Sequence, residues 1–159
     1  MSDVPRIENA DTAGGRVAPL GRVVFARISD DPITVEECAD AVADDTAGAV
    51  VTFAGVVRNH DVGKAVHELT YSAHPSAGEV ITSVAHFVAD EYPVTIAVAH
   101  RVGTLGIGDV ALACAVSSAH RAEAFAACSR LVDAVKESVP IWKQQEFDDG
   151  TSEWVASLG

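Results

Sequence analysis

The residues best suited to chemistry in this chain are cations that gather toward its C-terminal end. The chain has only three lysines, and two of them, Lys136 and Lys143, lie close together in the sequence. Its formal net charge is -12, so most of its surface repels anions. A local group of cations in such a protein favours a site for an anionic ligand. Solvated surface charge is the ordinary alternative for each cation alone, and only their shared position argues against it.

A second cationic feature stands at the start of a predicted helix that runs from Ser118 to about Val139. Residues 117–121 read Ser-Ser-Ala-His-Arg. The first turn of a helix presents unpaired backbone N–H groups and the positive end of the dipole, which attract an anion. A basic side chain there is unfavourable for the helix itself. His120 and Arg121 therefore suit a bound phosphate or carboxylate, but a serine cap beside two incidental surface residues explains them equally well.

For each of the remaining cations, a different structural explanation competes with ligand binding. Lys136 falls in the last helical turn, where a cation complements the dipole without any ligand. Lys143 has no such explanation, because it lies in a short β segment beside Trp142. Trp142 could line a pocket for a flat heterocycle, although the core is the commoner place for a tryptophan. Arg58 ends an apolar strand next to a polar loop and is a further candidate to hold an anion.

Composition excludes several classes of function. At 159 residues the chain fits a single domain. A pI near 4.7 argues against nucleic acid and anionic membranes as partners. No apolar run is long enough for a membrane helix, and the N-terminus lacks the pattern of a signal peptide. Three widely spaced cysteines, Cys38, Cys114 and Cys128, predict buried thiols in a reducing cytoplasm rather than nucleophiles or disulfides.

Two further motifs do not support ligand sites. The glycine-rich segment 103–109 precedes a predicted strand, whereas a phosphate-binding loop precedes a helix, so we interpret it as a tight connection. The six histidines lack the spacing of metal ligands, and we predict no metal site. No resident cofactor is expected either.

Periodicity predicts a single α+β domain over residues 21–159, after a flexible tail at residues 1–20. The apolar run 48–57 predicts a strand covered on both faces, which forms a hairpin with a strand at 66–71. A capping-box pattern starts the first helix at Thr34. The predicted helices are 34–43, 76–88 and 118–139, and the predicted strands are 22–28, 48–57, 66–71, 94–102, 110–116, 141–147 and 153–155.

Several motifs of this chain also resemble those of a known family. The longest are residues 53–60 (Phe-Ala-Gly-Val-Val-Arg-Asn-His) and residues 100–109, which begin His-Arg-Val-Gly. The others are residues 117–121, 135–136, 140–143 (Pro-Ile-Trp-Lys) and 153–154. Their order and spacing over about Arg22 to Val155 resemble the large, catalytic subunit of molybdopterin synthase.

The resemblance implies an α/β-hammerhead-type fold with a mostly antiparallel sheet. It also implies a homodimer that binds a small ubiquitin-like sulfur carrier at each end, which makes a heterotetramer. The carrier's C-terminal Gly-Gly thiocarboxylate would donate sulfur to cyclic pyranopterin monophosphate, and two transfers would build the dithiolene of molybdopterin. The chain would thus be a cytoplasmic sulfurtransferase of molybdenum cofactor biosynthesis.

The family's functional positions are present here, and the resemblance implies roles for them. Lys136 and Lys143 would be catalytic, and the substrate-binding residues would be Arg58, His120, Arg121, Gln144 and Gln145. Our hypothesis gives Lys136 the thiocarboxylate and the intermediate formed from it. Lys143 would bind the pterin and transfer protons, with the pKa of one lysine lowered by the other. Arg121 with His120 would hold the phosphate, and Arg58 would orient the substrate.

The substitution of Gln145 at a position where the family often has Glu leaves any carboxylate role there in doubt. A family member that has lost activity is therefore one alternative. Another is a non-catalytic module that binds an anionic metabolite or a partner's tail.

Helix geometry adds a separate constraint on the site. His120 and Lys136 are 16 positions apart, which corresponds to roughly 24 Å along a helix axis. One pterin-sized pocket cannot reach both. If all these residues serve one site, His120 and Arg121 must come from a second copy across a two-fold interface.

Overall fold

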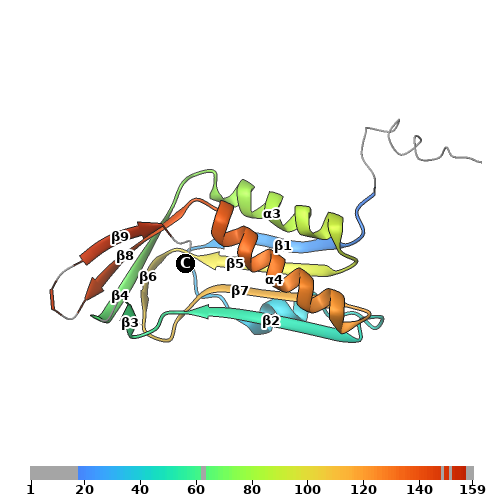
Figure 1. Ribbon diagram of the computed structural model, residues 1–159, viewed down its shortest axis with the longest axis horizontal. Helices are drawn as coiled ribbons and strands as arrows, with labels where there is room; N and C mark the ends of the chain where they lie inside the picture. Colours follow the sequence, from blue (N-terminus) through green and yellow to red (C-terminus); the bar gives the residue numbers. More distant parts are fainter. Residues whose placement is uncertain (1–17, 62–63, 148, 151, 157–159) are drawn as a thin grey trace, which may run out of the picture.

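The protein is built around two β-sheets that meet at a corner (Figure 1). A computed structural model describes residues 18–61, 64–147, 149–150 and 152–156. The larger body contains a four-stranded sheet in which β1 and β5 are parallel and the other neighbours antiparallel. Its strands, in spatial order, are β1 (Arg22–Ser29), β5 (Thr95–Arg101), β7 (Val110–Ser118) and β2 (Ala49–Val56).

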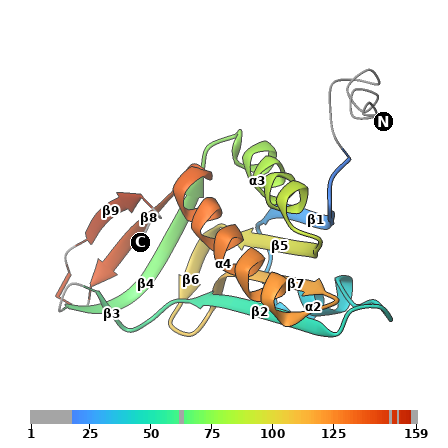
Figure 2. The same ribbon diagram turned by 45° about the vertical axis from the view of Figure 1, so that its right-hand side comes forward.

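Helices cover both faces of this sheet. Helices α3 (Ala77–Glu91) and α4 (Arg121–Ser138) lie side by side on one face, and the short α2 (Val35–Ala41) lies on the other (Figure 2). The α3–α4 face buries large side chains, among them Ile81, Ile96, Val98, Val116 and Leu131. The α2 face buries small ones, among them Cys38, Ala97, Ala99, Ala113 and Ala115. Strict alternation of large and small residues along β5 and β7 thus fixes which helix packs on which face.

The second sheet extends away from the helices, and we call it the β-arm. It contains β3 (His60–Asp61), β4 (Lys64–Ala73), β8 (Ile141–Phe147) and β9 (Ser152–Ala156), with β6 (Gly103–Gly106) also paired to β4. Gly103 and Gly108 have φ angles of 105° and 90°, a region that favours glycine. The glycine-rich segment is therefore a tight connection, as predicted, and it includes the short strand β6.

The predicted α+β class with mostly antiparallel pairing is confirmed, and the capping box at Thr34 is present in full. The buried state of the three cysteines is confirmed as well. Within the described residues, no helix is long and apolar enough to cross a membrane. Residues 1–17 of the predicted flexible tail lie outside the described residues.

The predicted hairpin between residues 48–57 and 66–71 is wrong. Strand β2 pairs with β7 at the edge of the four-stranded sheet, whereas β4 pairs with β8 in the β-arm. The prediction that β2 is covered on both faces is also wrong, because Val50 and Val56 are 49% and 53% exposed. Helix α2 has seven residues and packs over the alanines of the central strands, so one face of the edge strand stays open.

The predicted start of the last helix at Ser118 is three residues too early. Ser117 and Ser118 are the last residues of β7, and their hydroxyls donate to the backbone carbonyls of Val42 and His120. His120 occupies the N-cap position, and α4 begins at Arg121. The hydroxyls bind backbone outside the helix, so neither serine caps it.

Candidate active site

A pocket of about 290 Å³ opens where the four-stranded sheet, the C-terminal end of α4 and the β-arm come together. It is lined by Gly55, Val56, Arg58, Leu69, Tyr71, His100, Ala111, Leu112, Lys136, Lys143 and Gln145. These residues come from five strands, one helix and the segment after β2. The pocket therefore depends on the packing of the two sheets and not on any one local motif.

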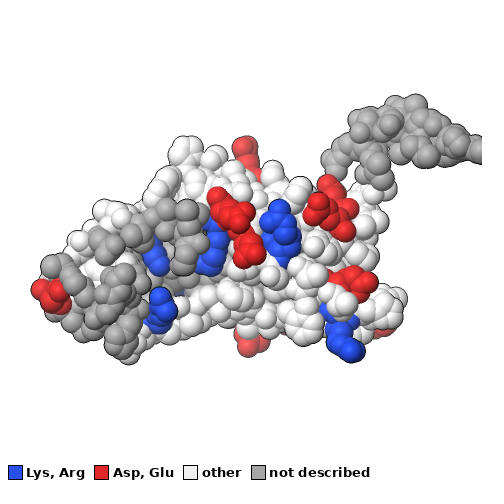
Figure 3. All heavy atoms as spheres, viewed as in Figure 1, with Lys and Arg blue, Asp and Glu red and all other residues white. Residues whose placement is uncertain are grey.

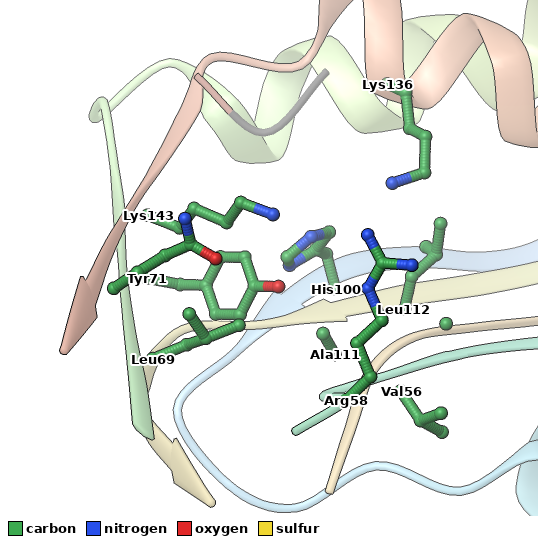
Figure 4. A pocket seen from close by; sticks show the side chains of 11 residues that line it. Val56, Arg58, Leu69, Tyr71, His100, Ala111, Leu112, Lys136 and Lys143 are labelled. Carbon is green, nitrogen blue, oxygen red and sulfur yellow. The ribbon is translucent and has the colours of Figure 1, made fainter. Parts of the chain in front are cut away.

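Three cations converge on this pocket. Arg58 follows β2, Lys136 lies in the last turn of α4, and Lys143 lies on β8. Their side chains point toward a common space around His100 (Figure 4). None of the described lining residues is Asp or Glu. Figure 3 shows several Lys and Arg side chains near the junction of the β-arm and the larger body. An anion that enters this pocket meets three cationic side chains, despite the strongly acidic chain.

The environment of Lys136 favours loss of its proton. Burial lowers the pKa of its ammonium group, and the nearby charge of Lys143 lowers it further. Both causes act against the charged form. The expectation that one lysine lowers the pKa of the other agrees with this geometry. A lysine of this kind can hold an anion when protonated and can accept a proton or attack as an amine when neutral.

An uncharged group of residues lies between the cations. His100, on β5, is buried, and burial lowers its pKa to about 4, with a further contribution from Lys136. Its ring packs edge-to-face on Tyr71 of β4 with a centroid distance of 5.2 Å. Burial raises the pKa of Tyr71, so the phenol stays protonated. At neutral pH both side chains are polar and uncharged.

Gln145 completes the β-arm side of the pocket. Its side chain is 2% exposed, and its amide Nε2 is a buried donor without a hydrogen-bond partner. Strand alternation places Gln145 and Lys143 on the pocket face of β8. Gln144 does not line the pocket; it pairs in register with Trp154, beside the half-exposed Trp142. The structure therefore brings Gln145 into the site and leaves Gln144 outside it.

His120 and Arg121 lie at the opposite end of α4 from Lys136. Both are exposed, and neither lines the pocket. Within one chain, the structure thus brings together Arg58, Lys136, Lys143 and Gln145, and it separates the phosphate-binding candidates from them.

His100 and Tyr71 are pocket residues that sequence reasoning did not assign to the site. One signal was available for His100: it is a titratable residue on the same face of an apolar strand as Ile96 and Val98. Such a histidine is usually a hydrogen-bonded core residue, so the pattern alone does not distinguish a core residue from a pocket residue. Among the described residues, no group of three His, Cys, Asp or Glu could hold a metal ion.

Fold and pocket together define a class: an α+β protein with a cationic pocket suited to an anionic substrate. The model of the MoaE protein family matches residues 28–138. The chain belongs to this family.

Individual relatives agree with this assignment. The chain is 40% identical over 129 residues to the molybdopterin synthase catalytic subunit of a Nostoc species, covering 79% of this chain and 78% of that protein. The crystal structure of molybdopterin synthase from Staphylococcus aureus matches with a TM-score of 0.77 and 34% identity, over 82% and 96% of the two chains. A complex of subunits 1 and 2 of molybdopterin-converting factor from Helicobacter pylori has a TM-score of 0.61 at 20% identity, over 82% and 88%. That last match shows a shared fold.

Proposed function

We propose that this chain is the catalytic subunit of a molybdopterin synthase, a sulfurtransferase of molybdenum cofactor biosynthesis. It takes sulfur from the C-terminal thiocarboxylate of a small ubiquitin-like carrier and transfers it to cyclic pyranopterin monophosphate. The observation that carries the proposal is the convergence of Arg58, Lys136 and Lys143 on one pocket, whose described lining has no Asp or Glu, in a chain of this family. Both reactants are anions, and the pocket supplies the charge to hold them.

Lys136 receives the carrier's thiocarboxylate in this proposal. Its half-buried position and its lowered pKa suit a group that alternates between holding an anion and accepting a proton. Lys143 binds the pterin and moves protons beside it, and Arg58 orients the substrate from the opposite wall. These roles require the positive groups to lie within reach of one ligand, and all three line the same pocket.

Two kinds of partner belong to the proposal. The first is the small sulfur carrier, and the two-subunit complex described for the Helicobacter pylori fold relative is consistent with such a partner. The second is another copy of this chain, in a homodimer within a heterotetramer. The second copy would contribute His120 and Arg121 to bind the phosphate, because these residues lie about 24 Å from Lys136 of their own chain.

One assay tests the proposed function. The chain is mixed with thiocarboxylated carrier and cyclic pyranopterin monophosphate, and mass spectrometry follows the dithiolene product. We expect two sulfur atoms to appear in each product molecule. If substrate and carrier bind but no sulfur is transferred, the non-catalytic alternative is correct. Lys136→Arg and Lys143→Arg extend this test, because a binding module tolerates them and proton transfer does not.

A further inference from the structure

His100 occupies a position that the cations alone do not explain. It is the next-to-last residue of β5, it is 5% exposed, and it lies on the sheet face beneath α4. It lines the pocket together with Lys136 and Lys143, and it lines a small adjoining cavity together with Lys136. A histidine at the centre of three cations has to remain neutral to avoid further repulsion.

Its hydrogen bond defines which ring nitrogen carries the proton. Nδ1 lies 2.8 Å from the backbone carbonyl oxygen of Arg101. A carbonyl oxygen only accepts, so Nδ1 donates, and in the neutral ring Nε2 has no proton. Nε2 is then the ring atom with a lone pair for a ligand in the pocket. In their charged forms Arg58, Lys136 and Lys143 only donate, so His100 supplies an acceptor that they lack.

Gln145 supplies the complementary donor. Its buried Nε2 has no partner, and a buried donor left unpaired costs free energy unless a ligand satisfies it. Gln145 and Leu69 are register partners on β8 and β4, and Tyr71 lies two residues along from Leu69 on the same face. Tyr71 in turn packs on His100. All three polar side chains line the same pocket, and we call them the neutral wall: Tyr71, His100 and Gln145.

We propose that the neutral wall reads the uncharged ring edge of the substrate, with His100 Nε2 accepting a hydrogen bond from a ring N–H. Gln145 Nε2 donates to a carbonyl oxygen of the same ring. The cations hold the anionic groups and cannot distinguish one phosphorylated ring from another, so this wall sets the specificity. The pyrimidinone edge of a pterin, with N–H next to C=O, has the required donor and acceptor. The inference rests on the proposed function, since it takes a pterin as the substrate class.

A pair of substitutions separates recognition from structure. The amide of Asn reaches the place of Nδ1, so His100→Asn keeps a donor for the carbonyl of Arg101 and removes the acceptor in the pocket. The amide of Gln reaches the place of Nε2, so His100→Gln keeps an acceptor there. We expect His100→Asn to weaken binding of pterin-6-carboxylate by about tenfold and His100→Gln by far less. Isothermal titration calorimetry on the full chain measures both, with the exposed His86→Asn on α3 as the matched control.

A change in the ligand, combined with the change in the protein, completes a double-mutant cycle. Methylation of pterin-6-carboxylate at ring N3 removes the N–H that His100 reads. The methyl group should cost the wild-type chain about tenfold in affinity and cost His100→Asn almost nothing, because that variant has already lost the acceptor. A purely structural role for His100 predicts the same cost in both chains. Gln145→Met should weaken binding of both ligands equally, since it removes the contact to the carbonyl oxygen.

The outcomes distinguish this inference from the proposed function. An equal methyl cost in wild type and His100→Asn, or no pterin binding by a wild-type chain that still makes the dithiolene, overturns the neutral wall and leaves the function intact. A wild-type chain that transfers no sulfur overturns the proposed function, whatever the affinities are. Loss of the methyl cost only in His100→Asn, with a thermal midpoint close to that of wild type, supports the inference.

Discussion

The two ends of helix α4 both carry basic side chains, but they place them in different surroundings. At the C-terminal end, Lys136 is half-buried and faces a pocket together with Lys143 and Arg58. At the N-terminal end, His120 and Arg121 are exposed and do not line this pocket. The C-terminal end thus forms part of a site within one chain, whereas the cations at the N-terminal end lie apart from that site.

The helix dipole sharpens this difference. A cation at the C-terminal end is favoured by the dipole, so the helix tolerates Lys136 without a ligand. The charged form of Lys136 is disfavoured by burial and by the charge of Lys143. A cation at the N-terminal end opposes the dipole, and there Arg121 is useful if an anion docks beside it. In the proposed function, catalysis belongs to one end and substrate holding to the other, and two copies of the chain unite them.

The largest expected effect is the loss of activity on removing a pocket lysine. Lys136→Ala or Lys143→Ala should lower dithiolene formation by more than about 100-fold, because each removes a group that, in the proposed function, holds an anion and transfers protons. The product is measured by mass spectrometry, and circular dichroism checks the fold. Arg22→Ala, an exposed cation on β1, is the matched control and should stay near wild type. Turnover within a few fold of wild type for either lysine variant would contradict the assigned roles.

Mixing variants from the two ends tests whether the ends meet across a dimer. In a dimer of one Arg121→Ala chain and one Lys136→Ala chain, one pocket receives both intact groups and the other receives neither. After subunit exchange in an equal mixture, half of the dimers are mixed, so recovery should reach roughly a quarter of the wild-type rate.

The control for this experiment mixes Lys136→Ala with Lys143→Ala. Both residues line the pocket of the same chain, so no mixed dimer regains an intact site. Absence of recovery in the test mixture would show that the two ends of α4 do not share a site. Recovery in the control would contradict the placement of Lys136 and Lys143 in the pocket of one chain.

A smaller effect is expected on the titration of Lys136, which tests how the two lysines interact at the C-terminal end of α4. Its pKa lies below the ordinary lysine value because of burial first and Lys143 second. The charged form is the one disfavoured, so Lys136 loses its proton at a lower pH than a free lysine. Removing the charge in Lys143→Ala should raise this pKa while burial still holds it below the ordinary value. Reductive 13C-methylation and NMR can follow each lysine, since the chain has only three. An unchanged Lys136 titration in Lys143→Ala would mean that the two groups do not interact.

Part of this arrangement could be predicted from the sequence because it depends on neighbouring residues. The capping box at Thr34 and the strand Ile141–Phe147 follow from local patterns, and both are present. Lys136 and Lys143 were identified by their closeness along the chain, and the turn at Pro140 brings both into one pocket. Strand alternation then places Gln145 beside Lys143.

The rest depends on contacts between distant segments. The apolar run of β2 gives no information on its partner, and the short separation from β4 favoured a hairpin over the observed pairing with β7, more than 50 residues away. His100 becomes a pocket residue only because α4 and the β-arm end above β5. Its tautomer follows from a backbone carbonyl, a contact that a sequence pattern does not specify.

The smallest expected effect concerns Phe125 on α4. Phe125 is 61% exposed, while Leu131 on the same helix is fully buried. Phe125→Ala should change the free energy of unfolding by less than about 0.5 kcal/mol, as a surface substitution does. Leu131→Ala should cost about 2–5 kcal/mol, because it leaves a cavity between α4 and the sheet. Urea unfolding of both variants at low protein concentration measures the difference. Phe125 lies one turn after Arg121 on the same side of the helix, so a stability loss for Phe125→Ala that grows with protein concentration would place this end of α4 in a dimer contact.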